Sequence, residues 1–145
     1  MCDDAVRPIK GDRGADVLNE PATPVAVELP AESGSCSRAR RMVDEAITTW
    51  GLPEEFADDA ALVVTELVSN GADHAEGPLR LTVSRTDDGV LIEVHDRSTA
   101  LPVLRPVSPE SPRGRGMIIV NALSKRWGVT PDAGGKTVWA ELIVS

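Results

Sequence analysis

Two polar residues stand one helical turn apart in the stretch TELVSNGADHA, which spans residues 65–75. Glu66 and Asn70 are four positions apart, so a helix would place both side chains on the same side. A carboxylate there can accept a proton, and an amide oxygen is a hard ligand of the kind that Mg²⁺ takes. Each residue also has an ordinary explanation: Glu66 as a half-exposed helix residue, and Asn70 as a partner for nearby backbone.

A further acidic residue, Asp96, ends a predicted strand. Its carboxylate can accept a hydrogen bond from the amino group of adenine. Guanine has a carbonyl at that position and would leave the buried acceptor unpaired, at a cost of about 1–3 kcal/mol. Alternatively, Asp96 caps the loop that follows it.

Glycines open a predicted helix at GRG, residues 114–116. Glycine lets the backbone approach a phosphate, and N–H groups at a helix N-terminus bind anions. Arg113 and Arg115 add positive charge that would offset the acidity of the chain. GRG alone is a weak signal. Taken together with Asn70 and Asp96, however, these glycines match the needs of a nucleotide bound without a P-loop. Glu66 could then accept a proton from the group that attacks the γ-phosphate.

The stretch GGKT, residues 134–137, resembles the end of a P-loop. That motif requires a glycine five residues before Gly135, where Thr130 stands, and a helix afterwards. The following TVWAELIVS alternates and is rich in strand-forming residues, so a glycine-rich hairpin turn is the better interpretation.

The composition excludes several classes of protein. The chain has 145 residues, a formal net charge of −8, three Trp, one Phe and no Tyr. Such acidity and so few aromatics argue against nucleic-acid binding, and the arginines at 38, 40 and 41 are best explained as a solvated helix face. No apolar run is long enough to span a membrane. The two cysteines, Cys2 and Cys36, lack metal or redox spacing, so we expect free thiols and a cytoplasmic protein.

Periodicity predicts an α+β fold. We expect a flexible tail over 1–23 and one domain over 24–145. The domain would begin with an edge strand (24–30), a helix (37–50) ended by Gly51, and a second helix from Pro53 to about 74. A hairpin (79–96), a long loop (97–113) and a helix within 114–128 would follow. The stretches RWGVTPD and KTVWAELIVS would form a final hairpin around DAGG. Helices segregated from mostly antiparallel strands predict a two-layer sandwich with the helices on one face.

In this arrangement the chain resembles the GHKL (Bergerat-fold) ATPases, and it looks most similar to stand-alone RsbW-like anti-sigma-factor kinases of actinobacteria. The resemblance covers about 25–145. It rests on ELVSNGADHA as the N box, VHDRS as the first glycine box, GRGMIIV with SKRWGV as the second, and GKTVWAEL as the closing strand pair. The order of these motifs makes the set far more specific than any one of them.

The resemblance implies roles for individual residues. Asn70 matches the Mg²⁺ ligand, Glu66 the catalytic base and Asp96 the adenine-binding acid. The remaining expected nucleotide-binding residues are Ser98, Gly114, Arg115, Gly116 and Thr137, the last of which matches a threonine near adenine. ATP and Mg²⁺ are the implied cofactors.

The sequence departs from the family in the first glycine box, usually Asp-x-Gly-x-Gly. Ser98 and Ala100 stand at its two glycine positions, and Gly71 stands where the family usually has Ala. A glycine within a helix costs up to about 1 kcal/mol relative to alanine. These departures bear on nucleotide affinity more than on the fold.

Three functions follow as expectations. The first is an anti-sigma kinase that phosphorylates a serine of an anti-anti-sigma (STAS-domain) partner and holds a sigma factor, as a homodimer by resemblance. The second is a regulatory interaction protein that keeps the fold and uses ATP weakly or not at all. The third, a fragment of a histidine-kinase system, is disfavoured because His74 and His95 lie in the N-box helix and a strand, with no separate phosphoacceptor helix.

Overall fold

In a computed structural model of the chain, residues 24–74, 77–97 and 112–144 are described. The first elements are strand β2 (Val25–Leu29), helix α1 (Ser35–Thr49) and helix α2 (Glu54–His74). Strands β3 (Leu79–Arg85) and β4 (Gly89–Asp96), helix α3 (Pro112–Leu123) and strands β5 (Arg126–Asp132) and β6 (Gly135–Ile143) follow. The predicted order of helices and strands is confirmed.

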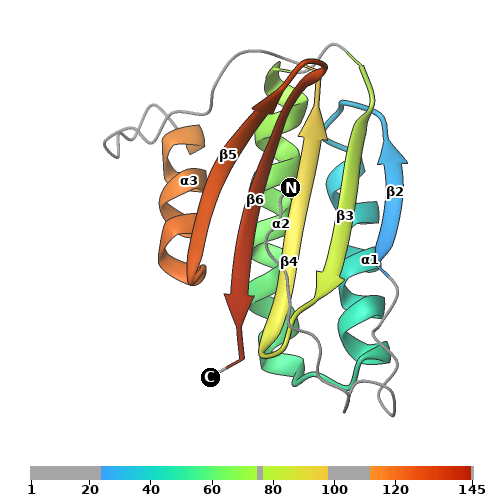
Figure 1. The fold of residues 1–145 in the computed structure, drawn as a ribbon, viewed down its shortest axis with the longest axis vertical. Coiled ribbons are helices and arrows are strands. Elements are labelled where there is room, and N and C mark those ends of the chain that lie inside the picture. The colour runs from blue at the N-terminus through green and yellow to red at the C-terminus, as the bar shows by residue number, and fades with distance from the viewer. Residues whose placement is uncertain (1–23, 75–76, 98–111, 145) are drawn as a thin grey trace.

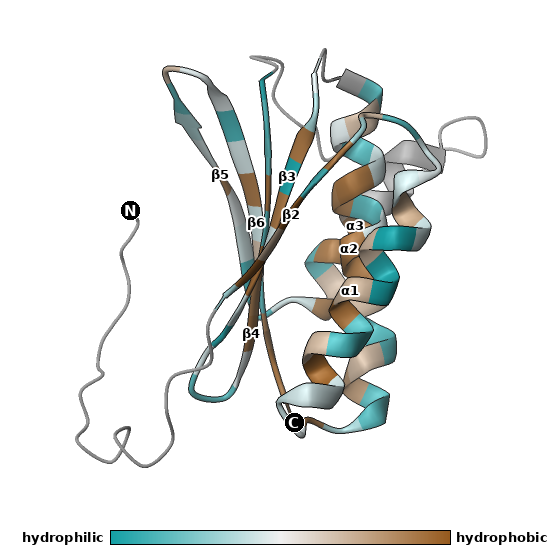
Figure 2. Cartoon of the chain, turned by 90° about the vertical axis from the view of Figure 1, so that its right-hand side faces the viewer, coloured by the Kyte–Doolittle hydropathy of each residue, from teal (hydrophilic) through white to brown (hydrophobic). Residues whose placement is uncertain are grey.

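The five described strands form one sheet in the order β2-β3-β4-β6-β5, and every described pairing is antiparallel. All three helices cover one face of this sheet, with α2 across its middle (Figures 1 and 2). The α+β two-layer sandwich with helices on one face is therefore confirmed.

Strand alternation builds the core between the two layers. On β3 and β4 every second side chain points to the helices and is buried, while its neighbours face the other way. The inward side chains of the sheet meet apolar residues of α1 and α2, and the buried apolar side chains of these strands and helices include Val43, Ile47, Val64, Leu67, Val68, Leu81, Ile92, Val94, Val138 and Leu142.

Helix α1 ends where the sequence predicts. Gly51 has φ 73°, a left-handed conformation that glycine adopts without strain. The N–H of Gly51 donates to the Thr48 carbonyl at 3.0 Å, and the N–H of Leu52 donates to the Ile47 carbonyl at 3.0 Å. These two bonds form a Schellman motif, which satisfies the last carbonyls of the helix and turns the chain into α2.

Helix α3 differs from the prediction at both ends. It begins at Pro112, before the glycines, and ends at Leu123, so the helical spacing does not continue to Trp127. Residues 126–132 form strand β5, as predicted for RWGVTPD. The N–H of Lys125 donates to the Glu141 carbonyl at 2.7 Å, and from Arg126 onward the chain pairs with β6. Sheet pairing with a strand distant in sequence therefore overrides the helical spacing of Arg126 and Trp127.

Candidate nucleotide site

Helix α2 carries the two residues that opened the sequence analysis. Glu66 and Asn70 lie in its C-terminal half, and both are half-buried. The helix contacts α1, α3 and the sheet, and it lies between the other two helices (Figure 1). Packing against these elements on both sides fixes the position of α2, and with it the positions of the Glu66 and Asn70 side chains.

Burial raises the pKa of the Glu66 carboxyl above its usual value of 4.5. Desolvation disfavours the charged carboxylate, so the group holds a proton more tightly than a fully hydrated glutamate. A general base works best when its pKa lies near the working pH. The burial of Glu66 therefore moves its pKa toward neutral pH, as a general base requires.

Asn70 has a buried polar atom without a protein partner. Among the described side chains, its Nδ2 atom is buried and makes no hydrogen bond. The two ends of an amide exchange places when the group is flipped, so the carbonyl oxygen can occupy the same position. Buried polar groups are nearly always satisfied, and an exception of this kind fits a residue that awaits a ligand.

Cys36 of α1 lies against the same part of α2. Its Sγ donates to the Thr65 carbonyl at 3.7 Å, and it is a free thiol, as expected. Burial is the main cause that raises the pKa of Cys36, with the charge of Glu66 adding to it. The thiol therefore stays protonated and keeps its hydrogen bond to the Thr65 carbonyl.

Asp96 is the last residue of β4, and its side chain is 0% exposed. It shares the helix-facing side of the strand with Val94. A Cβ built on Gly71 would stand 3.6 Å from Val94 Cγ1, so the α2 turn that follows Asn70 lies directly over this end of β4. The structure thus brings the Asn70 turn and the Asp96 strand end together.

Lys136 is the partner of Asp96, and it was not among the residues predicted for the site. Its Nζ donates to Asp96 Oδ1 at 3.0 Å and to Oδ2 at 3.1 Å, and its side chain is only 1% exposed. The two residues are direct partners in the β4–β6 register. The sequence contained a signal for this position. Every second residue of β6 faces the helices, and counting back two positions from Val138 gives Lys136.

Gly135 makes this close pairing possible. Its φ is 144°, and a Cβ there would stand 1.9 Å from the Asp96 carbonyl oxygen. Only glycine avoids that overlap, because it has no side chain. GGKT is therefore the turn and first residues of a strand, as predicted, and not part of a P-loop.

Thr137 lies on the other face of the sheet. It pairs with His95, and the two point away from the helices because Asp96 and Lys136 point toward them. His95 Nε2 lies 3.2 Å from Asp132 Oδ2 on that outer face. The structure does not bring Thr137 to the side of the sheet that holds Asp96.

The predicted phosphate-binding residues are only partly described. Gly114, Arg115 and Gly116 lie in the first turns of α3, which packs against α2. Helix α3 lies on the same face of the sheet as α2 (Figure 2). Ser98 lies outside the described residues.

The described residues contain no group of three or more His, Cys, Asp and Glu that could hold a metal. Mg²⁺ does not require one, since in nucleotide sites it binds one or two protein oxygens, phosphates and several waters. The unpartnered position of the Asn70 amide, which its oxygen occupies when the group is flipped, fits such a single protein ligand.

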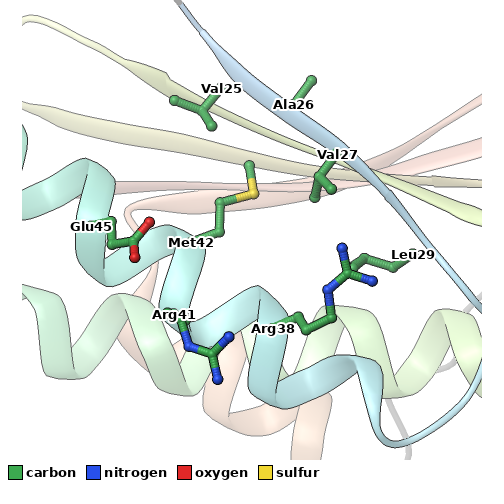
Figure 3. Close-up of a pocket in the computed structure, with 8 residues that line it drawn as sticks. All are labelled: Val25, Ala26, Val27, Leu29, Arg38, Arg41, Met42 and Glu45. Atoms are coloured by element: carbon green, nitrogen blue, oxygen red, sulfur yellow. The ribbon is translucent and has the colours of Figure 1, made fainter.

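A separate shallow groove lies between β2 and α1 (Figure 3). Met42 reaches from α1 toward Val25 and Val27, and Arg38 and Arg41 flank it. Both arginines are exposed, in agreement with a solvated helix face. None of the predicted site residues lines this groove.

Comparison with known proteins agrees with this architecture. The profile of the histidine kinase-like ATPase domain matches residues 29–142, and the chain therefore belongs to that family. No curated protein matches. The crystal structure of the RsbU and RsbW domains of Rv1364c from Mycobacterium tuberculosis is similar in fold, with 19% identity and a TM-score of 0.64. The match covers 86% of this chain and 34% of that one, so this chain spans about a third of its length.

Family membership confirms the predicted class: an ATP-binding, kinase-like domain of the GHKL type. The family profile covers the elements that carry Glu66, Asn70, Asp96 and Lys136. In the described part of the chain, no helix is both long and apolar enough to cross a membrane.

Proposed function

We propose that this protein is an ATP-dependent serine/threonine kinase of the anti-sigma-factor type. It transfers the γ-phosphate of ATP to a serine of a STAS-domain partner and thereby controls a sigma factor, acting as a homodimer. The fold shared with a protein that contains an RsbW domain supports this assignment. The observation that carries it is the pair Glu66 and Asn70, a carboxyl with a raised pKa one turn from a buried amide whose Nδ2 atom makes no hydrogen bond to the described residues.

In the proposed reaction the Glu66 carboxylate accepts the proton of the attacking serine hydroxyl. The serine oxygen forms a bond to the γ-phosphorus while the bond to the β–γ bridging oxygen breaks, and ADP leaves. The Asn70 side-chain oxygen would hold Mg²⁺, which would supply positive charge where negative charge develops. Backbone N–H groups in the first turn of α3, that of Gly114 among them, bind phosphate oxygens.

Labelled ATP tests the transfer step. We would incubate the full chain with ATP labelled at the γ-phosphate, Mg²⁺ and STAS-domain proteins from the same organism. Label should appear on a serine of one partner, and Glu66→Gln should abolish it while ATP still binds. Glu55→Gln is the matched control, because Glu55 is an exposed residue in the first turn of the same helix.

A regulatory binding protein without kinase activity is the second candidate. Ser98 and Ala100 at the glycine positions favour it, and so does the engagement of both Asp96 oxygens by Lys136. ATP binding without transfer to any STAS-domain protein would support this candidate over the kinase.

A further inference from the structure

Strand β2 stands at one end of the sheet. Among the strands of the described residues, only β3 pairs with it. In an antiparallel pair, alternate N–H and C=O groups point away from the partner strand, so half of these groups on β2 are directed outward. Val25 of this strand is 36% exposed, although it pairs with the buried Val83 and shares its face of the sheet. Such an edge can pair with a further strand.

Helix α1 lies beside this edge and runs antiparallel to β2. Residues 30–34 connect the two elements, and the Ser35 hydroxyl donates to the Pro30 carbonyl at 2.7 Å. The start of the helix is therefore held next to the end of the strand, and the helix returns along it. Apolar side chains line the groove between them, with Val27 on the strand and Met42 on the helix near its middle (Figure 3).

Charges of opposite sign stand at the two ends of this groove. Arg38 and Glu45 are two helical turns apart on α1, and Met42 lies between them on the same side of the helix. Both charged side chains are exposed. Arg38 lies toward the Leu29 end of β2, and Glu45 lies toward the Val25 end (Figure 3). A two-fold rotation about the middle of the groove therefore exchanges the positions of a positive and a negative charge.

We propose that the β2 edge and this side of α1 form the interface between two copies of the chain. In a two-fold arrangement centred on Val27, the two β2 strands pair antiparallel and join the sheets of the two copies. Arg38 then faces Glu45 of the partner subunit, and the two Met42 side chains meet at the middle. The inference rests on the proposed function, of which a homodimer is part, and it names the surface through which the homodimer forms.

The charge pattern favours a second copy over a partner of one charge. An acidic segment would pair with Arg38 but be repelled by Glu45, and a basic segment would do the reverse. Arg41, the other arginine of the groove, points away from β2 (Figure 3). The same surface turned by a two-fold rotation satisfies both ends at once, because an isologous interface meets itself in reverse. Each contact also occurs twice, so a change of one residue alters two ion pairs.

Charge reversal and charge exchange test the interface by sedimentation equilibrium of the full chain. Arg38→Glu or Glu45→Arg should each raise the dimer dissociation constant at least about tenfold, because each turns two attractive contacts into repulsive ones. The combined variant Arg38→Glu with Glu45→Arg reverses both charges, so it should return the constant to within about threefold of the wild-type value. Asp44→Arg is the matched control, because Asp44 is an exposed neighbour of Glu45 outside the residues that line the groove.

A monomeric wild-type protein would overturn the inference. A dimer that both single reversals leave unchanged, or that the combined variant does not restore, would overturn it too. Labelling of a STAS-domain partner, measured on the same samples, reports the kinase separately. Label transfer by a dimer that is insensitive to both reversals would count against the interface alone. A dimer with the expected charge dependence but no label transfer would count against the kinase and support the interface.

Discussion

Asp96 and Lys136 lie opposite each other on β4 and β6 and form an ion pair that is closed off from solvent. A buried charge is costly unless an opposite charge and hydrogen bonds compensate it, and here each group supplies both to the other. The pair thus links the stability of the sheet to the residue that is expected to bind the base. Any substitution of Asp96 acts on both.

Asp96→Asn should therefore destabilise the fold as well as change nucleotide binding. It leaves the Lys136 ammonium buried without its charge partner, which typically costs about 3–5 kcal/mol. Urea unfolding followed by circular dichroism measures the loss. The double variant Asp96→Asn with Lys136→Met should recover much of it, because no buried charge remains. A single variant as stable as the wild-type protein would contradict the importance of the pair.

Glu66→Gln should stabilise the protein at neutral pH. The pKa of Glu66 is raised on folding, so the folded state binds more protons than the unfolded state between 4.5 and the folded pKa. Stability therefore falls as the pH rises through that window, and the neutral amide of glutamine avoids the loss. Thermal unfolding at pH 4 and at pH 7.5 should show that the advantage of the variant grows with pH. An advantage that is equal at both values would exclude this cause.

The pH dependence of phosphate transfer should report the same group. A base must be deprotonated to work, so transfer should decline on acidification with a midpoint above 4.5. Initial rates of labelling at saturating ATP measure this midpoint. A midpoint at or below 4.5 would argue that Glu66 is not the base.

Gly135→Ala should lower the free energy of unfolding by more than the strain of a positive φ alone would. The conformation itself costs a non-glycine residue about 1–3 kcal/mol, and the new Cβ would overlap the Asp96 carbonyl. Gly51→Ala is the matched control: its φ is also positive, yet no atom lies within 4 Å of the Cβ position. Equal losses in urea unfolding would show that the contact with Asp96 has no effect.

Local patterns were sufficient to predict most of the fold. Alternation on β3 and β4 identified the inward faces, and Gly51 marked the end of α1. Residues 126–128 were ambiguous, because they continue the helical spacing of the preceding segment and also begin the strand predicted over RWGVTPD. Pairing of Arg126 with Glu141 decides that segment, and such a long-range partner is not visible in local sequence.

The candidate site was predicted less completely than the fold. Motif spacing identified Glu66 and Asn70, but the partner of Asp96 depends on strand register across 40 residues. Gly71 shows the same limit. As a helix residue it should only weaken α2, yet a Cβ there would stand 3.1 Å from Leu79 Cδ2, so the glycine also allows close packing against β3. The sequence of one helix cannot show what the neighbouring strand requires.

The central claim is that Asn70 binds the metal of a Mg·ATP complex beside Glu66. Calorimetric titration with ATP, with and without Mg²⁺, on the wild-type protein and Asn70→Ala tests it most directly. We expect binding that requires Mg²⁺ and is lost in a folded Asn70→Ala variant. The Ser69→Ala variant, which changes the adjacent half-buried residue, should retain it. Equal affinity in Asn70→Ala, or no binding by the folded wild-type protein, would contradict the account.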